Sequence, residues 1–235
     1  MQPVRPEWEA LLARIECPTM DHQLLQQALT HSSYANEEDV AHNERLEFLG
    51  DAVLELVCSQ FLYQHYPQRS EGELTRMRAN LVCEPTLAEI ARRLDLGKLL
   101  LLGKSQLVTG GRERPSILAD AVEALLGAVY LHYGLNQAEH VFALLFAEPM
   151  AALERGELWH DYKSGLQELV QREFPGDELS YTVCRESGPD HNKTFQVTVS
   201  QGSRVIGQGQ GKSKKEAEQM AARQALTRHF ARERR

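Results

Sequence analysis

The chain of 235 residues is predicted to form an all-α domain followed by a small α+β domain with the element order α-β-β-β-α. Up to about residue 155, apolar residues recur at helical spacing, and no strand-like alternation of useful length is present. After residue 161, a helical pattern is followed by three runs of period two and then by another helical pattern. We therefore expect a helical domain at 1–155, a linker at 156–161, a second domain at 162–230 and a charged tail at 231–235.

Helix start and stop signals place the helices of the first domain. Asp21 is a candidate N-cap for a helix that includes Leu29, and Asn43 is the candidate N-cap of the next long helix. Ser70, with Glu73 three residues later, is typical of a capping box. Three more helices are predicted at 86–94, 115–133 and 137–153.

The second domain begins with a predicted helix at 162–174, followed by strands at 179–186, 194–200 and 204–209. Turn-forming residues separate the three strands. A last helix is expected from Ser213, with Glu216 as its capping-box partner, to about Phe230.

Charge differs between the two parts of the chain. The net charge is -7, but residues 1–159 hold 13 Lys/Arg against 23 Asp/Glu, whereas residues 160–235 hold 13 against 10. An acidic first part and a mildly basic second part indicate two domains with different partners. The four cysteines are scattered and no signal peptide or membrane-spanning run is visible, so we expect no disulfide framework, no membrane association and a cytoplasmic location.

Acidic residues recur at helical spacing within two otherwise apolar runs. Glu44, Glu47 and Asp51 follow an i, i+3, i+7 pattern, and Asp120 and Glu123 an i, i+3 pattern, so each set lies along one side of its helix. Packing the two helices together would bring four or five carboxylates into one pocket. Such a pocket is costly unless a cation neutralises it.

Oxygen ligands alone favour Mg²⁺, Mn²⁺ or Ca²⁺ over zinc. A di-iron site is disfavoured, because it would require Glu-x-x-His on two helices. The alternative is that these acids form a solvated helix face or pair with Arg45, Arg76 and Arg78. Carboxylate-held Mg²⁺, with Mn²⁺ as a substitute, suits phosphoryl chemistry.

Two further polar features of the first domain have alternative interpretations. Glu71 either complements the dipole at a helix start or lies near the acidic pocket. The run His31, Ser32 and Ser33 is the nearest approach to a nucleophilic arrangement, and we expect it to have a packing or hydrogen-bonding role.

The second domain carries the residue types that recognise an RNA duplex. Lysines at the start of the last helix can bind phosphates, and polar residues of the first helix can reach 2′-hydroxyls and base edges in the shallow minor groove. The alternative for the lysines is a charged, solvated helix start. No aromatic pair provides a stacking platform for single strands. The candidate RNA-binding residues are Ser164, Gln167, Glu168, Gln171, His191, Lys193, Lys212, Lys214 and Lys215.

Several motifs together resemble bacterial ribonuclease III. The run from Asn43 to Ala52 is similar to the signature of that family, and the runs at 71–78 and 118–124 are similar to its other acidic motifs. Residues 30–34 resemble an early motif. Residues 162–230 resemble the double-stranded-RNA-binding domain that follows the nuclease domain in the family.

This resemblance implies a dimeric helical endonuclease domain and an RNA-binding domain. The activity it implies is hydrolysis of phosphodiesters in double-stranded RNA to 5′-phosphate and 3′-hydroxyl ends, in ribosomal and other structured precursor RNAs. By motif, Glu47, Asp51, Asp120 and Glu123 would bind Mg²⁺ and organise the attacking water, with Glu44 and Glu71 in accessory places. The alternative function is a catalytically silent double-stranded-RNA-binding protein.

Overall fold

The computed structural model describes residues 5–155, 162–188 and 193–233, with side chains described up to residue 227. It divides into two compact units, Met1–Met150 and Ala151–Arg235. The division falls within the last helix of the first unit, a few residues before the predicted linker at 156–161, which lies outside the described residues.

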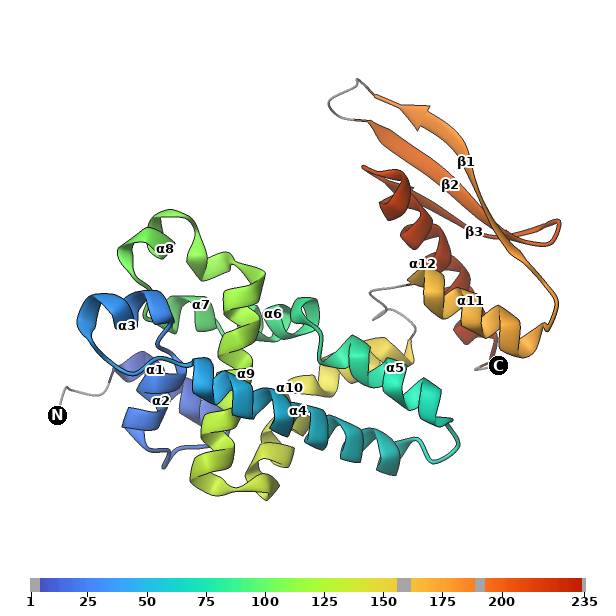
Figure 1. The fold of residues 1–235 in the computed structure, drawn as a ribbon. Helices are drawn as coiled ribbons and strands as arrows, with labels where there is room; N and C mark the ends of the chain where they lie inside the picture. The colour runs from blue at the N-terminus through green and yellow to red at the C-terminus, as the bar shows by residue number, and fades with distance from the viewer. Residues whose placement is uncertain (1–4, 156–161, 189–192, 234–235) are drawn as a thin grey trace. The chain divides into compact units, whose positions relative to one another are not determined.

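Helices make up the first unit (Figure 1). Its regular elements are α1 (Pro6–Arg14), α2 (His22–Ala28), α3 (Ser32–Glu38), α4 (Glu44–His65), α5 (Glu71–Leu81), α6 (Glu84–Arg93), α7 (Leu96–Leu99), α8 (Lys104–Val108), the 3₁₀ helix η1 (Gly111–Glu113), α9 (Pro115–Tyr133) and α10 (Leu135–Glu154). The predicted helices are all present. The α-helices α1, α3, α7 and α8 and the 3₁₀ helix η1 were not expected, because runs this short carry little periodic signal.

Local capping explains several helix boundaries. The Asp21 carboxylate accepts a hydrogen bond from the backbone N–H of Gln23, and Ser70 and Glu73 form the reciprocal capping box at the start of α5. The prediction for Asn43 is wrong in detail. It precedes α4, but its side chain makes no capping bond, because its backbone is already helical at φ -82° and ψ -16° rather than extended.

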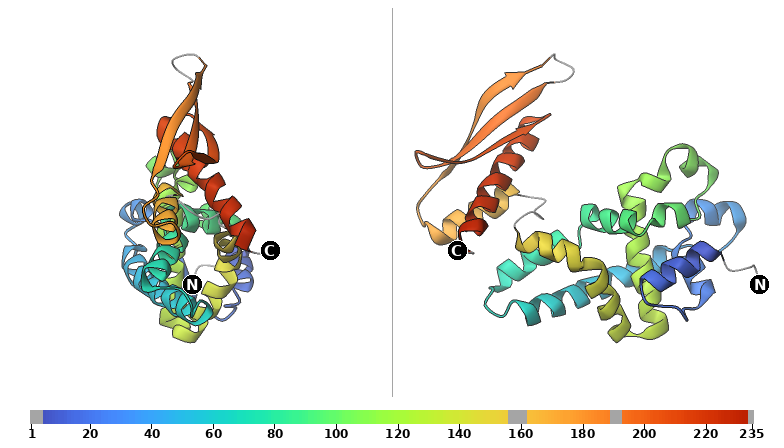
Figure 2. Two further views of the ribbon diagram at one scale, coloured as in Figure 1. Left: turned by 90° about the vertical axis from the view of Figure 1, so that its right-hand side faces the viewer. Right: turned by 180° about the vertical axis from the view of Figure 1, so that it is seen from behind.

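The core of the first unit surrounds α9. Eleven of its nineteen residues are buried, and α9 packs against α2, α4 and α6. Figure 1 and the view from behind in Figure 2 show α9 passing across α4. Because α9 is apolar on nearly all sides, any carboxylate that it carries must lie where α9 meets a neighbour and solvent. None of the described helices is both long and apolar enough to cross a membrane.

The second unit has the predicted α-β-β-β-α order: α11 (Tyr162–Glu173), β1 (Leu179–Ser187), β2 (Thr194–Gln201), β3 (Arg204–Gly211) and α12 (Lys214–Glu233). The strands form an antiparallel sheet in the order β1-β2-β3 among the described residues. The last helix continues three residues beyond its predicted end, into the expected charged tail.

Small residues bring α12 onto the sheet. Gly207, Gly209 and Gly211 alternate along β3, and a Cβ at Gly209 would lie 2.1 Å from the backbone nitrogen of Ala221. The core between sheet and helices is completed by Leu166, Val197, Val199 and Leu226. This packing fixes where α12 begins, at the edge of the sheet that follows Gly211.

Candidate metal centre and RNA-binding surface

The crossing of α4 and α9 places acidic residues from both helices beside each other. The two backbones touch at Gly50 and Gly127, since a Cβ at either position would overlap the backbone of the other helix. Glu47 lies one turn before Gly50, and Glu123 lies one turn before Gly127. Close approach of the two backbones therefore carries the carboxylates into a common space.

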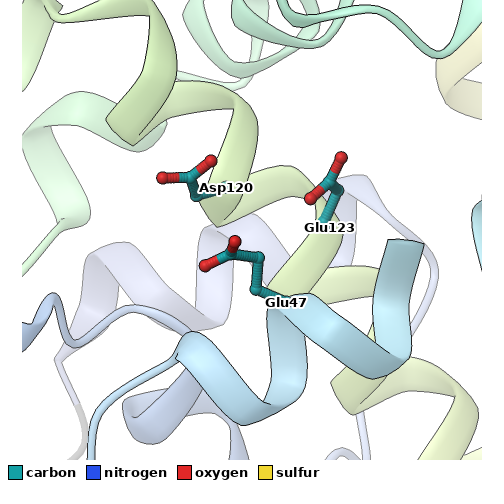
Figure 3. Close-up of side chains that lie close together, drawn as sticks. All are labelled: Glu47, Asp120 and Glu123. Atoms are coloured by element: carbon teal, nitrogen blue, oxygen red, sulfur yellow. The ribbon is translucent and has the colours of Figure 1, made fainter. Parts of the chain in front are cut away.

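Three carboxylates converge at this crossing. Glu47, Asp120 and Glu123 each offer a carboxylate oxygen, and these oxygens all lie within 4.8 Å of one another. Figure 3 shows Glu47 extending from α4, and Asp120 and Glu123 from α9, toward the same space. All three residues are half-buried. We refer to them below as the acidic triad.

Burial and the charges of neighbouring carboxylates raise the pKa values of the acidic triad. The pKa of Glu123 rises to about 8, first because of burial and then because of the charges of Asp51, Asp120 and Glu47. Burial followed by the charge of Asp120 raises the pKa of Glu47. Burial followed by the charge of Glu84 raises the pKa of Asp120. Among the residues that the structure describes, no basic side chain counters the charge of these carboxylates.

The donor set fits a hard divalent cation. Every ligand atom in the acidic triad is a carboxylate oxygen, and no His or Cys belongs to the group found among the described residues. The alternative in which Arg78 pairs with these acids is not supported, since its guanidinium binds Glu55 at 2.8 Å and Ser59 at 2.9 Å.

The other predicted acidic residues do not belong to the acidic triad. Asp51 is exposed on α4 and acts on the triad through its charge. Glu44 is also exposed, with its carboxylate 3.8 Å from His42. Glu71 begins α5, where its carboxylate accepts a hydrogen bond from the Thr75 hydroxyl at 3.0 Å. The structure thus brings three of the four principal carboxylates together.

His31 has the expected hydrogen-bonding role. Its Nδ1 atom caps the start of α3 by accepting a hydrogen bond from the backbone N–H of Ser33, and it lies 2.8 Å from the Ser33 hydroxyl. The same hydroxyl accepts from the backbone N–H of Gly103 at 2.9 Å. His31 and Ser33 therefore tie α3 to the segment before α8.

In the second unit, the start of α12 gathers the predicted lysines. Lys212, Lys214 and Lys215 are exposed around the first turn. The Ser213 hydroxyl accepts from the backbone N–H of Glu216 at 3.1 Å, as the capping-box prediction requires. The Glu216 carboxylate accepts from the N–H of Lys212 at 2.6 Å, one residue earlier than the usual capping-box partner.

Comparison with known proteins identifies both units. Residues 21–149 match the family described as ribonuclease-III-like, and residues 162–229 match the double-stranded RNA binding motif. Ribonuclease 3 of Desulforamulus reducens is 55% identical over 206 residues, covering 86% of this chain and 83% of the relative. Ribonuclease 3 of Natranaerobius thermophilus is 53% identical over 214 residues, covering 90% of each chain. The chain belongs to the ribonuclease III family.

A solved structure supports the assignment of the helical unit. The nuclease domain of ribonuclease III from Campylobacter jejuni matches with a TM-score of 0.56 at 41% identity, covering 59% of this chain and 96% of that domain. The predicted fold class, a helical ribonuclease III nuclease domain followed by an α-β-β-β-α RNA-binding domain, is confirmed. Membership of the ribonuclease III family also confirms the predicted enzyme class, an endoribonuclease.

The remaining candidate RNA-binding residues of this ribonuclease III-family chain belong to α11 or to the segment that precedes β2 in the sequence. Ser164, Gln167 and Gln171 are exposed on α11 at i, i+3, i+7 spacing, so they share one side of the helix, while Glu168 is half-buried. Lys193 is half-buried just before β2. His191 lies outside the described residues.

Two charged residues next to these sites were missed from the sequence. Glu84 is the first residue of α6. Its charge is the second-largest cause of the raised pKa of Asp120, after burial. Glu186, near the end of β1, pairs with Lys214. The sequence spacing of these two residues does not indicate their partners, because each reaches its partner through tertiary packing. Gly50 did carry a signal, since a glycine inside an apolar helix indicates close approach of another backbone.

Proposed function

We propose that this chain hydrolyses phosphodiester bonds in double-stranded RNA with Mg²⁺, leaving 5′-phosphate and 3′-hydroxyl ends. The observation that carries the proposal is the convergence of three carboxylates within 4.8 Å at the crossing of α4 and α9. An RNA-binding motif on the same chain supports a duplex substrate. The helical unit alone would indicate only a metal site, and the second unit alone would indicate only an RNA-binding module. Their presence on one chain favours a nuclease that acts on RNA.

Glu47, Asp120 and Glu123 would hold the cation, and Asp51, whose charge already acts on Glu123, is the fourth proposed ligand. A bound Mg²⁺ or Mn²⁺ supplies a water of lowered pKa and neutralises charge on the phosphate. Because the pKa of Glu123 is about 8, this carboxyl holds a proton at neutral pH when no cation is present. Glu44 and Glu71 are proposed accessory acids at the edge of the site.

The second unit is proposed to hold the duplex. Ser164, Gln167 and Gln171 offer hydroxyl and amide groups along one side of α11, which suits 2′-hydroxyls and base edges in a minor groove. Lysines at the start of α12 offer ammonium groups at a helix N-terminus, which suits phosphates. Glu168, His191 and Lys193 are proposed to contact the same RNA.

We further propose that the helical unit forms a homodimer through α4. Phe48, next to Glu47, is 81% exposed, and Leu56 and Tyr63 are exposed on the same side of the helix. Large apolar side chains gathered on one helix face typically mark a protein interface. The Campylobacter jejuni nuclease domain is described as having a region involved in dimer formation. A two-fold dimer would present one acidic triad to each strand of a duplex.

The test uses Glu123→Gln, which keeps the side-chain shape and removes the charge. We expect this variant to lose cleavage of a long duplex RNA in Mg²⁺, while its affinity for the duplex, measured in EDTA, stays within about two-fold of the parent chain. Glu7→Gln on α1 makes the same chemical change at an exposed carboxylate and should cut normally.

The rival function, a catalytically silent RNA-binding protein, predicts a different outcome. Under that hypothesis the parent chain would bind the duplex and leave it uncut in both Mg²⁺ and EDTA. Intact RNA after incubation with the bound parent chain and Mg²⁺ would therefore exclude the nuclease and support the rival.

A further inference from the structure

Lys214, one of the proposed phosphate-binding lysines, already has an anionic partner within its own domain. Its ammonium nitrogen lies 3.4 Å from Oε1 of Glu186 on β1. The same nitrogen lies 5.8 Å from the ring centre of Phe195 on β2. The carboxylate therefore stands at the start of α12, where the proposed function places RNA phosphates.

The sheet register fixes this arrangement. Glu186 is directly opposite Phe195 across β1 and β2, and Phe195 is directly opposite Gly211 across β2 and β3. Two residues after Gly211 the chain passes through Ser213 and enters α12 at Lys214. Neighbouring strands lie about 4.8 Å apart, so the three side chains meet at one end of the sheet as a consequence of the fold.

A carboxylate and a phosphate compete for the same partner. Both offer anionic oxygens, and an ammonium group at the surface binds either one. If Lys214 binds RNA while Glu186 stays in place, two anions are brought together and repel each other. If Lys214 leaves Glu186, the ion pair is lost. Each route lowers the affinity for RNA.

An opposite effect would arise if Glu186 held Lys214 in the orientation that RNA requires. The geometry argues against this role. The pair is long at 3.4 Å, and the side chains of Lys214 and Glu186 remain 60% and 46% exposed. Exposed pairs of this kind orient their partners weakly.

We propose that Glu186 competes with RNA phosphate for Lys214 and thereby limits the affinity of the domain for duplex RNA. This inference rests on the proposed RNA-binding function of α12.

The experiment measures duplex RNA binding by the full chain in EDTA, so that no cutting occurs. For Glu186→Gln we expect the dissociation constant to fall about two- to five-fold at roughly 0.1 M salt, with a smaller gain at higher salt. Glu178→Gln is the matched control. It makes the same charge change just before β1, about 26 Å along the strand from residue 186. It should change the dissociation constant by less than half as much.

A second pair of variants isolates the contact. In a Lys214→Ala background, Glu186→Gln should no longer tighten binding, because the group for which it competes is gone. The inference is overturned if Glu186→Gln leaves binding unchanged or weakens it, if Glu178→Gln tightens binding equally, or if the gain persists without Lys214.

The same measurements separate this inference from the proposed function. If Lys214→Ala weakens binding but Glu186→Gln does not tighten it, only the competition is wrong. If Lys214→Ala itself leaves the affinity unchanged, the start of α12 does not bind RNA, and the proposed RNA surface is wrong together with the inference. Circular dichroism melting of each variant verifies that the domain remains folded.

Discussion

The backbone of Gly50 on α4 lies directly against the carbonyl group of Glu123 on α9. A Cβ at residue 50 would be 1.8 Å from that carbonyl oxygen, and one at Gly127 would be 2.3 Å from the carbonyl oxygen of Leu46. Two glycines on facing helices thus let the backbones meet. The carboxylates of Glu47 and Glu123 flank this contact, so the acidic triad depends on it.

Gly50→Ala should disrupt both stability and cleavage. Alanine would favour the helix by about 1 kcal/mol relative to glycine. The new Cβ would, however, overlap the backbone of α9, which cannot rotate away as a side chain can. The two helices must therefore separate. We expect a net loss of about 1–3 kcal/mol in the free energy of unfolding, measured by urea denaturation, and a large loss of duplex cleavage.

Gly72→Ala is the control for this prediction. Gly72 lies on α5, and a Cβ there meets nothing within 4 Å. The substitution should therefore stabilise the protein by about 0.4–1 kcal/mol. A Gly50→Ala variant as stable and as active as Gly72→Ala would show that the helices tolerate separation.

The pKa shifts predict that the metal-free protein loses stability as pH rises. The pKa of Glu123 is about 8 in the folded protein and near 4.5 in the unfolded chain, so the folded state holds an extra proton between these values. A group with a raised pKa contributes stability at low pH that is lost as pH rises through the folded value. We expect the melting temperature in EDTA to fall from pH 5 to pH 8.5.

Two comparisons test the cause of this pH dependence. Excess Mg²⁺ should raise the melting temperature more at pH 8 than at pH 6, because the cation requires the deprotonated carboxylates. Glu123→Gln should flatten the EDTA profile, since it removes the group with the large shift. A profile in EDTA that is already flat for the parent chain would contradict the clustering of charge.

Local patterns predicted most of the fold. Helical spacing, the Asp21 cap and the Ser70 capping box placed α2, α4 and α5, and period-two runs placed the strands. These signals act within a few residues of the chain. Asn43 shows the limit of such local signals. Asparagine is a common N-cap, but Asn43 precedes α4 without capping it, because its own backbone is helical.

The sequence predicted which acidic residues supply the site, but not which of them lie close together in space. Spacing placed Glu47 and Asp51 on one side of α4, but only Glu47 enters the acidic triad. Which residue of a helix face meets the neighbouring helix depends on the crossing, and the crossing depends on Gly50. Glu84 and Glu186 were missed for the same reason, since their partners lie on other elements.

Substitution of two lysines should weaken RNA binding in a salt-dependent manner. Each phosphate contact contributes about 0.9 to the slope of log affinity against log salt for a B-form duplex. Lys214→Ala with Lys215→Ala should weaken duplex binding uniformly across sequences and reduce the slope by roughly one to two, measured in EDTA between about 0.05 and 0.2 M salt. Arg204→Ala, an exposed cation at the opposite end of β3, should leave the slope unchanged. Equal slopes for all three proteins would exclude phosphate contact by these lysines.

Phe48→Asp should separate the proposed dimer. An ionised carboxylate at an apolar interface is costly to bury, whereas in a monomer the side chain at residue 48 remains in water. Sedimentation should therefore show a monomer for the variant and a dimer for the parent chain. Val108→Asp is the control, because Val108 is 87% exposed and belongs to α8, which lies apart from α4 (Figure 1).

Cleavage by the Phe48→Asp monomer tests why a dimer is needed. One acidic triad can reach one strand, so the monomer should lose paired cuts in a duplex labelled on both strands and produce single-strand nicks at most. The parent dimer and the Val108→Asp variant should cut both strands at closely spaced positions. A strictly monomeric variant that makes paired cuts as readily as the dimer would show that one acidic triad serves both strands, and the mechanical reason for the dimer would be lost.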